Sequence, residues 1–196
     1  MGKIFCLMGK SSTGKDTIFE ILKRDESVKL KPIISYTTRP KRKGEQIGQT
    51  YHFINKEQLD EYDKDQKVIE QRCYNTVEGP WYYATIDDGQ IDLDSNSYIM
   101  IVTLEAYGKL ISYFKEEDII PIYICVEDGV RIERALNREK KQTQPNYDEM
   151  CRRFLADQND FSNQMLKKYS IEEYYYNNNL ADCLELIKNN ICKYLN

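Results

Sequence analysis

Residues 9–17, GKSSTGKDT, decide the fold of this chain. They match G-x-x-x-x-G-K, the P-loop pattern, in which backbone N–H groups surround phosphates and the lysine reaches the terminal phosphates of a nucleoside triphosphate. The full pattern places Ser or Thr directly after the lysine, where the hydroxyl binds Mg²⁺. Here Asp16 follows Lys15, and Thr17 comes one position later. The sequence predicts a triphosphate site with an altered metal-binding position.

The residues on either side of this loop predict the secondary structure that the pattern requires. Residues 3–8 (KIFCLM) form an apolar run typical of a buried strand, and residues 15–24 have the apolar spacing of a helix. A glycine turn between a strand and a helix directs N–H groups and the helix dipole toward an anion. The loop residues predicted to bind the triphosphate are Gly9, Ser11, Ser12, Thr13, Gly14, Lys15, Asp16 and Thr17. Asp16, as a hard oxygen ligand, and Thr17 are the candidate Mg²⁺ ligands.

Composition excludes several classes of protein. The chain has 196 residues, and 28 Lys and Arg against 32 Asp and Glu give a net charge of −4, whereas bulk nucleic-acid binding needs a basic surface. No apolar stretch approaches the ~18 residues of a membrane span, and the N-terminus does not resemble a signal peptide. The six cysteines form no C-x-x-C pair, which indicates a reducing compartment. We expect a cytoplasmic protein without nucleic-acid or membrane partners, as a monomer or homodimer.

Strand and helix patterns alternate along most of the chain. Alternation of this kind predicts an α/β fold with a parallel sheet covered by helices on both faces. Strands are expected at 3–8, 32–38, 98–103, 119–126 and 172–176, and helices at 15–24, 104–115, 128–141, 147–168 and 179–195.

Two stretches interrupt the alternation. Residues from about 39 to 97 are polar and turn-rich, which indicates an inserted lobe, and residues from about 128 to 167 form amphipathic helices around a polar tip, which indicates a mobile flap. We expect one domain, a P-loop three-layer fold. Its core is expected at about 1–34, 97–127 and 168–196, the lobe at about 35–96, and the helical lid at about 128–167.

A second motif lies in residues 35–53, SYTTRPKRKGEQIGQTYHF. Arg39 and Arg42 are three residues apart and can converge on one phosphate, because guanidinium forks bind phosphate oxygens bidentately. Tyr51 can add a neutral donor. The stretch resembles the monophosphate-binding lobe of guanylate kinases, S-x-T-T-R-x-x-R-x-G-E-x-x-G-x-x-Y-x-F, at the same offset from the P-loop. The alternative interpretation is a solvated basic loop.

Residues 68–85, VIEQRCYNTVEGPWYYAT, resemble the next element of that family, with about one extra residue in the loop and Ala84 in place of a glycine. A carboxylate suits guanine because N1–H and the exocyclic amine are adjacent donors, whereas adenine sets its N1 lone pair against that carboxylate. The resemblance assigns to the acceptor nucleotide Ser35, Arg39, Arg42, Tyr51, Glu70, Tyr83, Thr85 and, in place of a family aspartate, Thr103. Thr103 has no charge, which leaves the strictness of the guanine preference open.

The predicted lid contains arginines that match those of nucleoside monophosphate kinases. Arg134 and Arg138 lie four residues apart on one helix face, and Arg153 lies on the next helix. Phosphoryl transfer depends on positioning and electrostatic stabilisation, so no catalytic base is assigned. The expected catalytic residues are Lys15, Arg39, Arg138 and Arg153, and Arg134 is expected to bind ATP. The alternative is that these arginines pair with Glu133, Glu139 and Asp157.

The resemblance implies ATP-dependent phosphorylation of GMP, and of dGMP, to GDP, with ATP and Mg²⁺ as cofactors and small-molecule nucleotides as partners. Two other interpretations remain. One is a related kinase for another phosphorylated acceptor such as ribose 1,5-bisphosphate; the loop of that kinase reads G-K-D-S and shares with residues 14–17, G-K-D-T, the Asp after the lysine. The other is a non-catalytic guanylate-kinase-like binding module.

Overall fold

A parallel five-stranded sheet forms the core of the computed structural model, which describes residues 1–42, 44–76 and 79–195. The strand order is β2-β7-β1-β8-β9, and each pairing in this sheet is parallel. The strands are β1 (Ile4–Met8), β2 (Lys31–Pro32), β7 (Tyr98–Ile101), β8 (Ile119–Cys125) and β9 (Tyr174–Tyr176). The α/β fold with a parallel core sheet, predicted from the sequence, is therefore confirmed.

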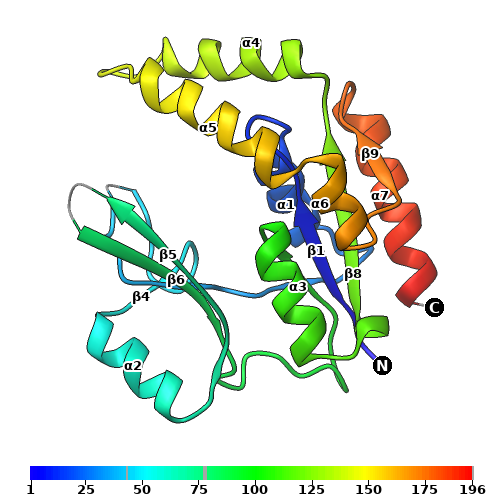
Figure 1. Cartoon of the computed structure of the whole chain (residues 1–196). Helices are drawn as coiled ribbons and strands as arrows, with labels where there is room; N and C mark the ends of the chain where they lie inside the picture. The colour runs from blue at the N-terminus through cyan, green and yellow to red at the C-terminus, as the bar shows by residue number, and fades with distance from the viewer. Residues whose placement is uncertain (43, 77–78, 196) are drawn as a thin grey trace.

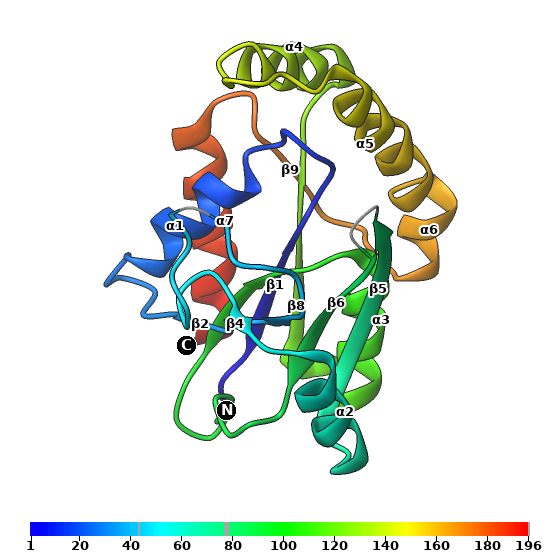
Figure 2. The ribbon, with the colours of Figure 1, turned by 90° about the vertical axis from the view of Figure 1, so that its left-hand side faces the viewer.

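Strand β1 lies at the centre of this sheet and is buried along its whole length. Successive side chains of a strand point to opposite faces, so Phe5 and Leu7 enter one apolar cluster while Ile4, Cys6 and Met8 enter the other. Helices cover both faces, which gives the three layers (Figure 2). One face is covered by α1 (Lys15–Lys23) and α7 (Leu180–Leu195), the other by α3 (Leu104–Tyr113) and α6 (Asn163–Lys168).

A smaller lobe projects from the core beside α3 (Figure 1). Its sheet has the order β4-β3-β6-β5, and Tyr36, Leu59, Ala84 and Ile86 form its own small apolar cluster. Its elements are β3 (Tyr36–Thr37), β4 (His52–Phe53), α2 (Lys56–Lys64), β5 (Val68–Thr76) and β6 (Gly79–Ile86).

Two lid helices extend from the core above the P-loop (Figure 1). They are α4 (Asp128–Glu139), which directly follows β8, and α5 (Tyr147–Asp160), and a short 3₁₀ helix at Glu116–Asp118 precedes β8. Within the described residues, no helix has the length and apolar character needed to cross a membrane.

The structure corrects two predicted elements. The strand expected at 32–38 divides into β2 and β3, which belong to different sheets, because Ile34 N–H donates to the Gln90 side chain instead of continuing the core ladder. The helix expected at 147–168 ends at Asp160, since Phe161 turns into the core and stacks on Tyr123, and α6 begins at Asn163.

Candidate active site

The P-loop connects β1 to α1 and is pressed against its neighbours at both glycines. A Cβ atom on Gly9 would lie 2.3 Å from the Ile124 carbonyl oxygen, and one on Gly14 would lie 2.5 Å from Asn177 Nδ2. Gly14 also has φ +89°, a left-handed conformation that favours glycine. The two glycines of the motif are therefore required by close approach to β8 and to residue 177.

Asn177, directly after β9, holds the loop in place. Its Nδ2 donates to the Thr13 carbonyl over 2.8 Å, and its own N–H donates to the Cys125 carbonyl over 2.9 Å. Its carbonyl accepts from Nη2 of Arg134 over 3.1 Å. One buried residue thus joins the loop, the end of β8 and the lid, through contacts that are distant in the sequence.

The loop offers unused donors where a phosphate would lie. Gly14 caps α1 without a side-chain hydrogen bond, so the first N–H groups of the helix lack the capping partner that most helices have. Ser12 has φ +65°, and its hydroxyl is buried without a hydrogen-bond partner. An orphaned buried hydroxyl beside a helix N-terminus fits a bound anion.

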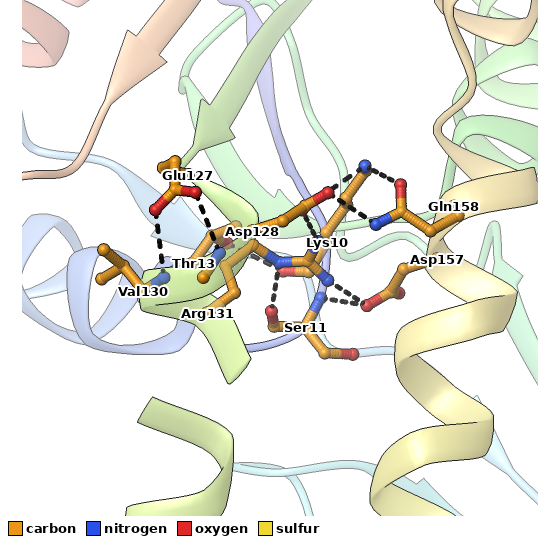
Figure 3. Close-up of polar contacts among 10 residues, drawn as sticks. Lys10, Ser11, Thr13, Glu127, Asp128, Val130, Arg131, Asp157 and Gln158 are labelled. Carbon is orange, nitrogen blue, oxygen red and sulfur yellow. Dashed lines mark hydrogen bonds and ion pairs between the residues drawn. The ribbon is translucent and has the colours of Figure 1, made fainter. Parts of the chain in front are cut away.

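Arg131 of α4 fastens the lid to the P-loop (Figure 3). Its Nε donates to the Ser11 carbonyl over 2.9 Å, and its Nη1 and Nη2 donate to Asp128 and Asp157 over 2.5 and 2.8 Å. Asp157 of α5 also accepts the Ser11 N–H over 2.7 Å. The Arg131 side chain is only 1% exposed and lies over the Phe154 ring. The sequence did not indicate this cluster, because its members are separated by up to 146 positions.

Lys10 adds a second polar contact between loop and lid (Figure 3). Its Nζ donates to the Gln158 side chain over 2.6 Å and lies 3.8 Å from Asp128. Gln158 in turn donates to Asp128 over 2.7 Å. The lid therefore contacts the loop through charged and amide groups.

The lid arginines predicted from the sequence surround the loop. Arg134 and Arg138 line a cleft of about 470 Å³ together with Ser12, Gly14, Asp16 and Thr17, the donor cleft. Arg153 lines a cavity of about 20 Å³ with Ser11, Ser12 and Arg138. The expected alternative pairing with Asp157 is not formed by Arg153, whose Nε donates to Glu149 over 2.9 Å. Asp157 instead accepts a hydrogen bond from Arg131.

Arg39, predicted to hold the acceptor phosphate, is fixed within the lobe. Its guanidinium donates to both carboxylate oxygens of Glu45, over 2.8 and 2.5 Å, and lies over the rings of Tyr51 and Phe53. The hydrogen bonds from Arg39 hold the pKa of Glu45 at about 2. Arg42 contributes its backbone N–H to Glu45 over 2.7 Å, while its side chain is exposed. The structure therefore joins the two arginines through Glu45.

The predicted base-reading residues lie on one face of the lobe sheet. Glu70 on β5 is opposite Thr85 on β6, whose hydroxyl donates to Glu70 over 2.9 Å. Two residues along the strand, Arg72 lies opposite Tyr83, and Tyr83 packs edge-on against Tyr51. Arg72, which sequence reasoning missed, donates to both oxygens of Glu70 over 3.0 and 3.1 Å. Its i, i+2 spacing from Glu70 was the available signal, because such residues share a strand face.

A second cleft, of about 330 Å³, opens between the core and the lobe. Ser35 and Tyr51 line this acceptor cleft, as does Asp16 of α1, which also lines the donor cleft. Thr103, the remaining predicted acceptor residue, caps α3 by accepting the Ala106 N–H over 3.2 Å. Its hydroxyl is therefore used locally, at the helix that packs on β5.

A P-loop, an arginine-bearing lobe and an arginine-bearing lid around adjoining clefts define the class of P-loop nucleoside monophosphate kinases. The guanylate kinase family model matches residues 1–192, and the chain belongs to that family. Guanylate kinase of Mycoplasma mobile is 30% identical, covering 96% of this chain and 91% of that protein. Guanylate kinase of Mesomycoplasma hyopneumoniae is 26% identical, covering 98% and 95%. The crystal structure of guanylate kinase from Anaplasma phagocytophilum shares the fold with TM-score 0.66 at 19% identity, covering 98% of this chain and 85% of that one.

The contact between Gly14 and Asn177 predicts a specific loss of stability. Gly14 and Gly89 both have φ +89°, but a Cβ on Gly89 would meet no atom within 4 Å. Gly14→Ala must displace the Asn177 amide, so we expect it to lower the free energy of unfolding by about 2 kcal/mol more than Gly89→Ala. Urea titration measures both. Equal losses would show that backbone strain alone requires glycine at position 14.

The Arg131 cluster predicts a second difference between variants. Asp157→Ala leaves a buried guanidinium with one carboxylate fewer, so we expect a loss of roughly 3 kcal/mol in the free energy of unfolding. Glu149→Ala, on the same helix, removes only exposed ion pairs with Arg152 and Arg153 and is expected to cost under about 1 kcal/mol. Thermal or urea denaturation compares them, and similar losses would contradict the role given to Asp157.

Proposed function

We propose that this chain transfers the γ-phosphoryl group of ATP to GMP, and to dGMP, producing GDP or dGDP. The observation that supports this most directly is that the donor and acceptor clefts adjoin at Asp16, in the first turn of α1. One cleft is lined by P-loop residues and lid arginines, and the other lies between α1 and the lobe residues Gln49, Thr50 and Tyr51. Two clefts that meet at a P-loop helix suit transfer between two bound nucleotides.

The proposed roles follow from charge and position. Lys15 and the P-loop N–H groups hold the donor phosphates. Arg134 lines the donor cleft together with Ser12 and Gly14 of the loop. Arg138 and Arg153 supply positive charge for the transferring group, while Arg39 and Arg42 hold the acceptor phosphate. The acceptor phosphate is already an anion, so no residue is needed as a base. Glu70 and Thr85 read the guanine edge, with Thr103 near the same helix–sheet junction.

Mg²⁺ is proposed as the metal that accompanies ATP. Among the described residues there is no cluster of three or more His, Cys, Asp or Glu side chains suited to a metal. This fits Mg²⁺, which is commonly held by one or two carboxylates together with substrate phosphates and water. Asp16 and Thr17, both exposed in the donor cleft, would hold it there, and it would neutralise phosphate charge.

The two alternatives are less well supported. A ribose 1,5-bisphosphate acceptor has no base, which would leave the buried carboxylate of Glu70 and its partner Thr85 without a ligand to recognise. A non-catalytic module has no need for a P-loop lysine and three lid arginines around one loop. The same proposal includes a cytoplasmic location, the absence of nucleic-acid and membrane partners, and a monomeric or dimeric state. It also includes the residue limits given above for core, lobe and lid.

A coupled assay of ADP release tests the function. With ATP and Mg²⁺, GMP and dGMP should give turnover, while AMP, UMP and ribose 1,5-bisphosphate should give at least about a hundredfold less, the scale on which buried hydrogen-bond readout discriminates. Lys15→Met, purified in parallel, controls for contaminating kinases and should be inactive. Turnover of another acceptor without turnover of GMP would overturn the assignment, and binding of an ATP analogue without any turnover would favour the binding module.

Asp16 places a negative charge beside a polyanion, so activity should depend strongly on the metal. We expect Asp16→Ser to raise the Mg²⁺ concentration for half-maximal activity roughly fivefold, because it removes a proposed carboxylate ligand and one charge at ~4 Å in water is worth about 1 kcal/mol. Asp148→Ser, another exposed first-turn aspartate, lies on the lid helix and should leave this concentration unchanged. A decrease or no change in Asp16→Ser would exclude this role for Asp16.

A further inference from the structure

The carboxylate of Glu70 already has a bidentate partner within the protein. Arg72 Nε donates to Oε2 over 3.0 Å and Nη2 donates to Oε1 over 3.1 Å. Glu70 has no exposed side-chain surface, and Arg72 is 15% exposed. Burial disfavours the Arg72 cation, but the neighbouring Glu70 carboxylate outweighs it, so the pKa of Arg72 is raised. The guanidinium is therefore charged, and it lies on the face of the lobe sheet that also carries Glu70.

The donor pattern of Arg72 copies that of guanine. The Nε–H and Nη2–H groups of arginine are adjacent, coplanar and joined through one carbon, as are N1–H and the 2-amino group of guanine. Both forks fit one carboxylate in the same in-plane geometry. With Thr85 donating to Oε1 as well, Glu70 has no room for a second bidentate partner in that plane.

Arg72 lies near the acceptor cleft. Arg72 lies opposite Tyr83 in the β5–β6 ladder, and Tyr83 packs edge-on against Tyr51, which lines the acceptor cleft. The Glu70–Arg72 pair therefore lies on the same face of the lobe sheet as Tyr83, next to the proposed site of the acceptor base. A base that reached Glu70 would have to replace the arginine fork.

We propose that Arg72 is a specificity-determining residue that competes with guanine for Glu70, so that the acceptor base binds only by replacing the arginine fork. This inference rests on the proposed function. Guanine replaces both hydrogen bonds, and the buried carboxylate stays paired throughout. Adenine presents a lone pair at N1 and cannot displace Arg72, so Arg72 excludes adenine from binding to Glu70. The same competition lowers the affinity for GMP.

Arg72→Met tests the competition by steady-state kinetics with GMP as the varied substrate. Removing the competitor should lower KM for GMP about tenfold, the size of one hydrogen bond to a charged group, with kcat within about twofold of the unmodified protein. Lys3→Met is the matched control. It also strips a cation, 18% exposed, from a buried carboxylate, that of Asp118, but at the opposite end of β1 from the P-loop. It should leave KM unchanged.

An unchanged or higher KM in Arg72→Met would overturn the proposal, because a purely structural or base-contacting arginine gives those results. Failure of the proposed function gives a different result: the unmodified protein does not turn over GMP. If Arg72→Met then binds GMP by calorimetry, competition is supported; if neither protein binds GMP, both proposals fall.

A measurement on the unmodified protein covers the case in which Arg72→Met does not fold. The Nε–H resonance of Arg72 in ¹⁵N-labelled protein, assigned by its loss in Arg72→Lys, should be protected from solvent exchange. Saturating GMP should shift it and speed its exchange, whereas AMP at the same concentration should not. A resonance that is unchanged at GMP saturation would show that Arg72 stays on Glu70, against the proposal.

Discussion

The hydrogen bond from the Asn177 amide to the Thr13 carbonyl joins segments 164 residues apart, and the arrangement of the active site depends on it. The amide lies so close to the P-loop that only glycine fits at position 14. Its carbonyl also accepts from Arg134 of the lid. The loop, the last core strand and the lid are thus fixed relative to one another by a single buried side chain and its backbone.

Buried ion pairs fix side chains in both the lid and the lobe. Arg131 and Asp157 hold the lid against the loop through Ser11, and Glu45 fixes the orientation of Arg39, the residue proposed to hold the acceptor phosphate. Such pairs contribute little net stability over apolar packing, but removing one partner is costly. The ion pairs of this protein therefore determine where its charged side chains lie. In our proposal, the Glu70–Arg72 pair also determines which base can bind.

Much of the fold and part of the site could be predicted from local patterns. The loop at residues 9–17 and the alternation of strands and helices indicated the parallel sheet, because both are short-range signals. The strand expected at 32–38 was wrong in one respect, since it divides between two sheets. Local hydrophobicity shows that residues are buried, but not which sheet buries them; here a long-range hydrogen bond from Ile34 to Gln90 decides it.

The sequence by itself determined the class of chemistry: a phosphate-binding loop, clustered arginines and a carboxylate suited to guanine are all local motifs. Only the tertiary structure decided which charges meet. Asp157, expected as a partner of lid arginines, contacts Arg131 and the loop, and Glu70 is paired with Arg72 on the same strand face. The physical reason is that an ion pair depends on distance and burial, which the order of residues does not specify until the chain has folded.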